Sequence, residues 1–230
     1  MSSNVLIKTE ELIKRYPIGS QQLTALKNIN LEIKKGEFSG VVGPSGSGKT
    51  TLLNIIGTLD KPTEGSASIL GRKVEELSHA QAAGLRNKHL GFIFQTYNLL
   101  PVYTVFENVE FPLLLLDWSK EKRRKAVEQA LEWVHLQDKI NVRPDQLSGG
   151  QAQRAAIARA IVKGSEVVLA DEPTANLDAE NSHNIMDVLV ELNQKLQTTF
   201  LFSTHDEKVI GYMKRIIKLD DGRVVDDKYL

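Results

Sequence analysis

The spacing of apolar and polar residues predicts an alternation of strands and helices along the chain. Strand patterns, either alternating or short and continuously apolar, occur at residues 5–9, 29–33, 38–42, 66–70, 90–94, 166–170, 199–203 and 216–219. A helix is expected from residue 50 to about 56, and residues 185–196 carry apolar side chains at the spacing of an amphipathic helix. Strand, loop, helix and strand again is the rhythm of a parallel α/β sheet.

Residues from about 96 to 145 interrupt this rhythm. Pro101 and Pro112 break the pattern. An amphipathic helix follows them, and its apolar face is formed by Val127, Ala130, Leu131 and Val134. We interpret this stretch as a mainly helical insertion. The expected organisation is one domain over residues 1–230, with a core of residues 1–95 and 146–230 and a helical subdomain at approximately 96–145.

Composition narrows the classes of partner. The chain has 230 residues, 41% of them hydrophobic, and its 29 basic and 29 acidic residues give a net charge of +0. A chain with no net charge is not attracted as a whole to a polyanion, so no nucleic-acid partner is expected. With no cysteine, a disulfide framework and a thiolate zinc site are excluded. The apolar run at 113–116 is too short to cross a bilayer, so we expect a soluble protein that reaches a membrane only through a partner.

A phosphate-binding loop is the first candidate site. Residues 43–50 read GPSGSGKT, a full match to G-x-x-x-x-G-K-[ST], between an apolar strand and a helix start. Its glycines let several backbone N–H groups point at one phosphate chain. Lys49 supplies a cation for the β and γ phosphates, and the Thr50 hydroxyl is an oxygen ligand suited to Mg²⁺. The candidate nucleotide-binding residues here are Gly43, Ser45, Gly46, Ser47, Gly48, Lys49, Thr50 and Thr51.

An acidic pair ends the strand pattern at residues 166–170. In VVLADE, Asp171 is expected to hold Mg²⁺ through water. The Glu172 side chain points elsewhere, because side chains alternate along an extended backbone, and a carboxylate there can accept the proton of an attacking water. The pair predicts nucleotide hydrolysis. A purely structural hydrogen bond or salt bridge by Glu172 is the alternative.

A phosphate-loop kinase would use the same loop and Mg²⁺ ligand, together with an acceptor pocket and an Arg-rich lid. Basic residues do gather in the 96–145 stretch, at Lys120, Lys122, Arg123, Arg124 and Lys125. Because Glu121 and Glu128 lie among them, we interpret this cluster as a solvated helix face.

A second glycine-rich helix start follows far along the chain. LSGGQ at residues 147–151 opens an Ala-rich helix and so presents backbone N–H groups to an anion. With ADEPTANLD at 170–178 and His205 in STHD, it resembles the ATP-binding-cassette ATPases, and the resemblance covers nearly the whole chain. It implies a P-loop NTPase fold, in which a RecA-like core carries an N-terminal antiparallel β region and an inserted helical subdomain.

In that family two cassettes pack head to tail and enclose two ATP molecules. The resemblance implies that this chain closes over ATP bound to a second copy, through Ser148, Gly149, Gly150 and Gln151. The Ser hydroxyl, the exposed N–H groups and the positive helix end would contact the γ-phosphate. Ser148 is also a good helix N-cap, which is compatible with this role. The implied cofactors are ATP and Mg²⁺, and the implied partners are a second copy and an integral membrane permease.

The resemblance assigns roles to further residues. Gln95 matches the glutamine that senses Mg²⁺ and the attacking water, and His205 matches the switch histidine that contacts the γ-phosphate. Asp178 matches a loop that crosses between subunits, although it would also serve as an N-cap. Tyr16 lies where the family stacks an aromatic ring on adenine, whereas an isolated tyrosine near a strand usually packs in a core.

The sequence departs from the family pattern in two places. Ala152 replaces the long polar residue that usually follows LSGGQ, and the loop before Asp178 begins with Ala175 and Asn176. Neither change removes a phosphate-binding atom.

Residues 91–115 and the short length most resemble the cassettes of lipoprotein-release and macrolide-export systems, and also a cell-division ATPase. The implied function is an ATP-hydrolysing subunit on the cytoplasmic face of a membrane, coupling nucleotide-driven dimerisation to a permease or mechanotransmission subunit. Residues 97–116 are the candidate docking surface, with core packing of the helical lobe as the alternative. A regulatory cell-division-type ATPase and a non-transport ATPase acting on DNA or ribosomes are the other hypotheses.

Overall fold

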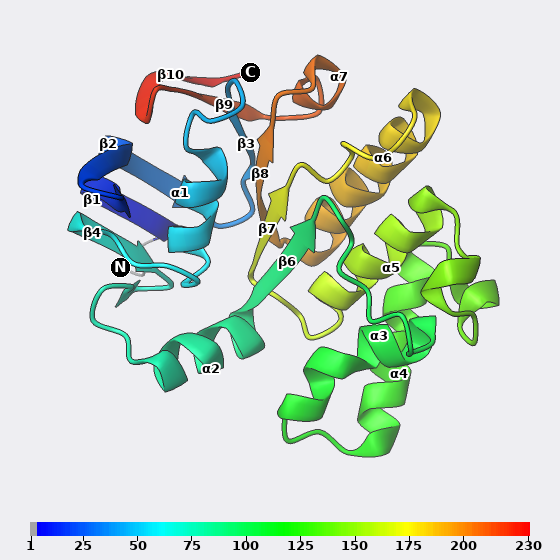
Figure 1. The fold of residues 1–230 in the computed structure, drawn as a ribbon. Coiled ribbons are helices and arrows are strands. Elements are labelled where there is room, and N and C mark those ends of the chain that lie inside the picture. Colours follow the sequence, from blue (N-terminus) through cyan, green and yellow to red (C-terminus); the bar gives the residue numbers. More distant parts are fainter. Residues whose placement is uncertain (1–3) are drawn as a thin grey trace.

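The computed structural model describes residues 4–230, apart from the side chain of Glu207. Its strands form two sheets, with helices between and outside them (Figure 1). The strands are β1 Val5–Ile18, β2 Gln21–Lys34, β3 Phe38–Val42, β4 Glu64–Ile69, β5 Arg72–Lys73, β6 Leu90–Phe94, β7 Val167–Asp171, β8 Thr199–Thr204, β9 Arg215–Asp220 and β10 Arg223–Tyr229. The helices are α1 Lys49–Ile56, α2 His79–His89, α3 Val105–Glu110, α4 Lys120–Trp133, α5 Gly149–Ile161, α6 Ala179–Leu196 and α7 Glu207–Ile210, with 3-10 turns η1 Phe111–Leu115, η2 Gln137–Lys139 and η3 Pro144–Gln146.

The smaller sheet has the strand order β2-β1-β4-β5, and its pairs are antiparallel. It confirms the expected N-terminal antiparallel region. The strand patterns at residues 5–9 and 29–33 mark only part of the two long strands β1 and β2. Register shifts between these strands, one of them between Thr9 and Leu12, break the alternation of apolar and polar residues, which explains why their full length escapes the pattern.

The larger sheet has the order β10-β9-β3-β8-β7-β6, and β9, β3, β8, β7 and β6 run parallel. This confirms the predicted parallel α/β sheet. Successive side chains point to opposite faces, so Phe200 and Phe202 of β8 pack into one hydrophobic cluster and Leu201 into the other. Both faces are therefore covered, as the nearly continuous apolar strands require.

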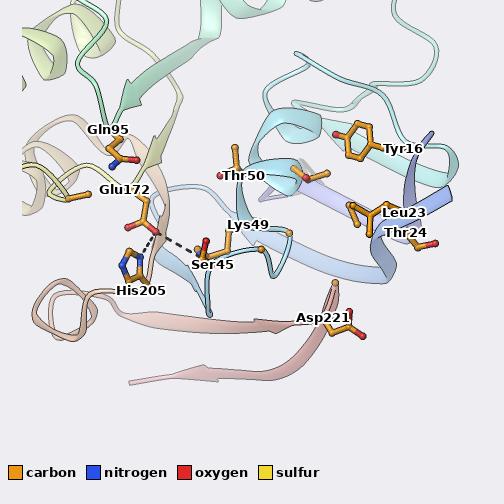
Figure 2. A pocket seen from close by; sticks show the side chains of 16 residues that line it. Tyr16, Leu23, Thr24, Ser45, Lys49, Thr50, Gln95, Glu172, His205 and Asp221 are labelled. Carbon is orange, nitrogen blue, oxygen red and sulfur yellow. Dashed lines mark hydrogen bonds and ion pairs between the residues drawn. The ribbon is translucent and has the colours of Figure 1, made fainter. Parts of the chain in front are cut away.

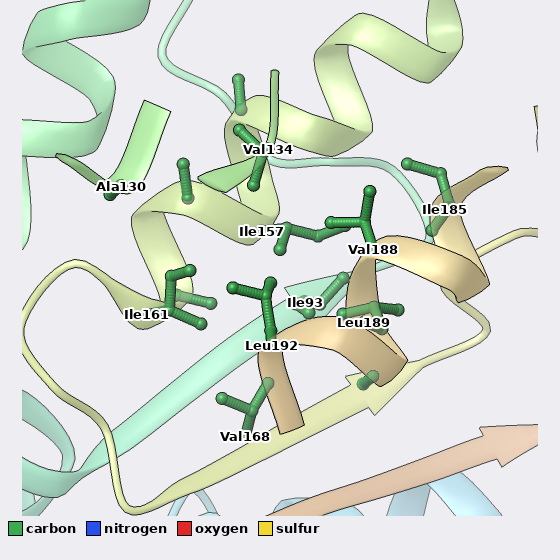
Figure 3. Close-up of a cluster of buried hydrophobic side chains, with 14 of the residues drawn as sticks. Ile93, Ala130, Val134, Ile157, Ile161, Val168, Ile185, Val188, Leu189 and Leu192 are labelled. Carbon is green, nitrogen blue, oxygen red and sulfur yellow. The ribbon is translucent and has the colours of Figure 1, made fainter. Parts of the chain in front are cut away.

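Each face of the parallel sheet has its own core. On one face α1 lies between the two sheets and buries Leu52, Leu53, Ile55 and Ile56. On the other face α5 and α6 cover the sheet with Ile157, Ile161, Ile185, Val188, Leu189 and Leu192, as Figure 3 shows. The predicted helix face at Val127, Ala130 and Leu131 belongs to α4, which packs on α5 from outside.

Apolar spacing missed the four-residue helix α7 and the longer helices α2 and α3. Helix α2 buries only Ala82 and Leu85, too few for a visible apolar stripe. Helix α3 is only six residues long. Helices α2 and α3 each begin with a capping box, Ser78 with Gln81 and Thr104 with Glu107, which was the available signal. Within the described part of the chain, no helix combines the length and apolar character needed to cross a membrane.

Candidate active site

A cavity of about 550 Å³ opens where the phosphate loop leads from β3 into α1 (Figure 2). Its lining residues are Tyr16, Leu23, Thr24, Ala25, Ser45, Gly46, Gly48, Lys49, Thr50, Thr51, Gln95, Glu172, Ala175, His205, Asp221 and Gly222. The cavity lies at the carboxyl ends of the parallel strands, where open α/β sheets bind their ligands.

The fold itself brings the distant motifs together. Gly43, Gln95, Glu172 and His205 directly follow the ends of β3, β6, β7 and β8. These strands are neighbours in the order β3-β8-β7-β6 and run in one direction, so their carboxyl ends share one edge of the sheet. The phosphate loop, the acidic pair, the histidine and the glutamine thus meet because of sheet topology.

The phosphate loop needs glycine at its helix end. Gly48, the N-cap of α1, has a φ of 106°, and a Cβ there would lie 2.7 Å from the carbonyl oxygen of Ala25. The Lys49 ammonium, whose side chain is only 7% exposed, donates to the carbonyl oxygens of Gly43 at 2.8 Å and Pro44 at 3.0 Å. A cation held by neutral carbonyls beside exposed loop amides suits the phosphates of a nucleotide.

Glu172 lies between a cation and a histidine. Its Oε1 lies 2.7 Å from Nδ1 of His205 and 4.0 Å from Nζ of Lys49. Figure 2 marks both contacts with dashed lines. Its backbone has a φ of 46°, which non-glycine residues rarely adopt, and its N–H donates to the carbonyl oxygen of Ser203 at 3.0 Å. This backbone turns the carboxylate out of the strand and into the cavity. The histidine is largely exposed and so accessible to a ligand.

Asp171 and Thr50 provide oxygens suited to a divalent cation. The Thr50 hydroxyl lies 3.1 Å from each carboxylate oxygen of Asp171. Ser203 donates a second hydrogen bond to this carboxylate, at Oδ1. A carboxylate and a hydroxyl beside the phosphate loop form a donor set that fits Mg²⁺, which binds one or two protein oxygens and completes its shell with water and phosphate.

Tyr16 lines the cavity at the side away from Lys49 (Figure 2). Its hydroxyl donates to Oδ2 of Asp60 at 2.8 Å, and Nζ of Lys14 lies 4.8 Å from the ring centroid. Burial, assisted by the hydrogen bond to Asp60, raises the pKa of the Tyr16 phenol above its usual value. A neutral ring held at the cavity wall by its hydroxyl presents a face on which a flat base could stack.

Two predicted loop residues, Gly43 and Ser47, support the cavity from behind. A Cβ at Gly43 would lie 2.0 Å from the carbonyl oxygen of Leu219, so only glycine fits against β9. Ser47 is buried, and its hydroxyl has no hydrogen-bond partner among the described residues. The Gln95 carbonyl accepts a 2.9 Å hydrogen bond from Asn176, which ties the end of β6 to the loop after Glu172.

The LSGGQ residues Ser148, Gly149, Gly150 and Gln151 are not among those that line the cavity within residues 4–230. Ser148 is the N-cap of α5, and its hydroxyl accepts from the Gln151 N–H at 3.3 Å. This bond leaves the hydroxyl proton free to donate. A Cβ at Gly150 would lie 2.7 Å from Oδ1 of Asn181, so the helix start packs closely against α6.

Asp178 is the N-cap of α6. Its Oδ1 accepts from the Asn181 N–H at 2.8 Å, and this bond lowers the pKa of the Asp178 carboxyl. Asp178 therefore does act as a helix N-cap, the alternative role considered for it. Its side chain is not among those that line the cavity within residues 4–230.

Several lining residues were not predicted. Leu23, Thr24 and Ala25 belong to β2 and reach the cavity only by tertiary packing. Asp221 and Gly222 form the turn between β9 and β10, with φ values of 40° and 73°. Asp-Gly between two strands is a standard two-residue hairpin signal, and it would have revealed β10.

Comparison with known proteins identifies the family to which the chain belongs. The family described as ABC transporter matches residues 26–175. The macrolide export ATP-binding/permease protein MacB of Burkholderia thailandensis is 44% identical over 97% of this chain, but the chain spans only 34% of that relative's length. The uncharacterized ABC transporter ATP-binding protein MJ0796 of Methanocaldococcus jannaschii is 44% identical over 98% of this chain and 97% of its own length.

Solved structures show the same similarity. A dimeric structure of the MJ0796 cassette bound to ADP and Pi has a TM-score of 0.90, covering 98% of this chain and 99% of that one. The cbiO1 protein of Clostridium perfringens, part of the cbiONQ transporter complex, is 31% identical with a TM-score of 0.89, covering 99% of this chain and 89% of that one. The chain belongs to the ABC transporter family and is one of its ATP-binding cassettes.

Proposed function

We propose that this cassette hydrolyses ATP and drives a membrane transport or mechanotransmission system of the lipoprotein-release or efflux type. The observation that carries the proposal is the contact of Glu172 with His205 at 2.7 Å and its approach to Lys49 at 4.0 Å, within one cavity. A base, a polar residue that orients it and a phosphate-binding cation are thereby in reach of one another.

The proposed chemistry assigns one task to each side chain. The loop amides and Lys49 hold the β and γ phosphates, and Mg²⁺, when bound by Thr50 and Asp171, neutralises their charge. Glu172 accepts the proton of the water that attacks the γ-phosphorus, and the bond to the bridging oxygen of ADP breaks. His205 holds the Glu172 carboxylate and contacts the γ-phosphate, and Gln95 orients the water. Tyr16 stacks on the adenine.

A second copy completes each site in this proposal. Ser148 and the N–H groups of Gly149 and Gly150 would face the γ-phosphate held by the partner's phosphate loop. Two observations support this arrangement. The LSGGQ residues do not line the cavity of their own chain, and the MJ0796 cassette is dimeric in its solved structure. The Asp178 loop, next to the start of α6, would lie near the boundary between the copies.

The membrane partner would dock on the apolar surface formed by η1 and the turn before α3. Exposed large apolar side chains gather there, at Val102 and Tyr103 before α3 and at Phe111, Leu114 and Leu115 in η1, and Leu115 is 71% exposed. MacB is named as an ATP-binding/permease protein and cbiO1 as part of a transporter complex. These relatives and the exposed surface support a location on the cytoplasmic face of a membrane. The docking segment in this proposal is residues 97–116.

The experiment that tests this function removes the base. Glu172→Gln should still bind Mg-ATP, because the loop and Lys49 are intact, and should hydrolyse it on the order of a hundredfold or more slowly. It should also accumulate as a dimer on size-exclusion chromatography in the presence of ATP.

A matched control is Glu166→Gln, which removes an exposed carboxylate paired with His89 at 2.7 Å, before β7. This control should keep normal turnover and form no trapped dimer. Near-normal hydrolysis by the Glu172 variant would exclude this residue as the base.

A further inference from the structure

Ser203 touches both members of the acidic pair. It is fully buried on β8, opposite Asp171 in the parallel register with β7. Its hydroxyl donates to Oδ1 of Asp171, and its backbone carbonyl accepts the N–H of Glu172 at 3.0 Å. The carbonyl contact belongs to the backbone and survives any substitution, whereas the hydroxyl contact depends on the side chain.

The Ser203 hydroxyl lies in a buried strand, where its neighbours Phe202 and Thr204 are buried as well. The β8 backbone is paired with β7 and β3. A buried hydroxyl without a partner destabilises the fold, and in the described part of the chain the partner of the Ser203 hydroxyl is Asp171. Core packing alone therefore gives no reason for a hydroxyl at this position.

The two bonds on Asp171 fix the plane of its carboxylate. Ser203 holds Oδ1 from the strand side, and the Thr50 hydroxyl lies 3.1 Å from both oxygens on the α1 side. Rotation of the carboxylate about its own axis would break the first bond. Asp171 does not itself line the cavity within residues 4–230, so its approach to a ligand is on the side of Thr50, which does. The bond from Ser203 occupies one acceptor position of Oδ1 and leaves Oδ2 with the Thr50 contact alone among the side chains of the described residues.

We propose that Ser203 is a positioning residue for divalent-cation binding, orienting Asp171 toward a cation that Thr50 and the phosphates share. The proposal rests on the proposed nucleotide site and goes beyond it, since Ser203 is buried and is not among the described residues that line the cavity. It predicts that the Ser203 hydroxyl contributes to nucleotide affinity only when Mg²⁺ is present.

The test measures binding rather than turnover. The affinity of the full chain for a fluorescent, non-hydrolysable ATP analogue is titrated in EDTA and over a range of Mg²⁺ concentrations. For Ser203→Ala we expect about a tenfold rise in the Mg²⁺ concentration needed for half-maximal tightening, the effect of one hydrogen bond to a charged group. Affinity in EDTA should not change.

A matched pair of variants separates the effect of the hydroxyl group from the effect of side-chain volume. Ser203→Thr keeps the hydroxyl and should resemble the parent, while Ser203→Val has the shape of threonine without the hydroxyl and should resemble Ser203→Ala. In an Asp171→Asn background, Ser203→Ala should cause no further change in Mg²⁺ dependence.

Equal loss of affinity with and without Mg²⁺ would overturn the proposal, because a general distortion of the cavity would then explain the effect. Identical behaviour of the Thr and Val variants would also overturn it. Failure of the unmodified chain to bind the analogue at all would contradict the proposed function itself, so the two failures are distinguishable.

Discussion

Lys163 shows how burial sets the charge of a single residue. It follows α5, lines a second cavity of about 410 Å³ with Trp118 and Trp133, and donates to the carbonyl oxygen of Arg86 at 2.8 Å. Burial lowers the pKa of its ammonium from 10.5 to about 8. At neutral pH the folded chain therefore carries a partly buried charge that the unfolded chain would solvate freely.

This burial predicts a pH-dependent stability. Between about pH 8 and 10.5 the unfolded state binds more protons at Lys163 than the folded state, so the free energy of unfolding rises with pH in that window. Lys163→Met keeps an apolar stem and removes the charge. We expect this variant to be about 1–3 kcal/mol more stable than the parent at pH 7. Its free energy of unfolding should lack the increase with pH that Lys163 causes in the parent.

Urea unfolding at pH 7 and pH 9.5 measures both effects, with Lys120→Met at the exposed start of α4 as the control. If the Lys163 variant and the parent gain the same stability between the two pH values, the lysine is not the source.

At the scale of elements, α5 is fixed to the loop that follows the acidic pair. Gln153 of α5 is fully buried, and its Nε2 donates to the carbonyl oxygen of Pro173 at 2.6 Å. Its Oε1 has no partner within residues 4–230. The helix that begins with LSGGQ is thereby joined to the residue after Glu172, which connects the two halves of the proposed composite site.

Gln153→Met should loosen this connection with little change in overall stability. The loss of the bond to Pro173 costs free energy, but the buried, unpartnered Oε1 disappears as well, so we expect a net change of under about 1 kcal/mol. Amide hydrogen exchange across residues 172–178 should accelerate, since the loop loses its anchor on α5. The control is Gln194→Met on the exposed side of α6. Unchanged exchange in the loop would show that other contacts hold it.

The site was predictable where a motif is local and lies at a strand end. Gly43 and Glu172 directly follow apolar strands, so sequence spacing sufficed to place the phosphate loop and the acidic pair at strand ends. His205 also follows a strand directly, but its place in the site was inferred from the family resemblance. The contribution of Ala25 was not predictable, because β2 reaches the phosphate loop only through the packing of two sheets. The Ser203 hydroxyl was missed for the same reason, since its bond to Asp171 depends on the β7–β8 register.

The fold follows a similar division. Continuous apolar runs identified the buried parallel strands, because both faces of that sheet are covered. The second half of β1 and the first half of β2 pair with each other in a sheet with register shifts and mixed exposure, where no fixed period exists to be detected. Capping boxes and the Asp221–Gly222 turn are the local signals that would have recovered α2, α3 and β10.

At the scale of the whole molecule, LSGGQ lies outside the nucleotide cavity of its own chain, and this placement has a consequence for the symmetry of a dimer. Two identical chains that pack about a two-fold axis exchange equivalent surfaces, so an LSGGQ that reaches the partner's phosphate loop implies the reciprocal contact. Each of two sites then takes its loop from one chain and its Ser148 from the other. Defects in the two motifs should therefore complement each other when they are on different chains.

Mixing two inactive variants tests this arrangement. Lys49→Ala removes the phosphate cation, and Ser148→Arg places a bulky side chain at the start of α5, so each should be inactive alone. In a mixed dimer one site combines both defects and the other has neither, so random pairing should restore about a quarter of the parent ATPase activity. A mixture no more active than its separate components would mean that LSGGQ serves the nucleotide of its own chain or none.

The control mixes Lys49→Ala with Glu172→Gln, two defects on the same side of the site. Every site in that mixed dimer still carries one defect, so this pair should restore no activity.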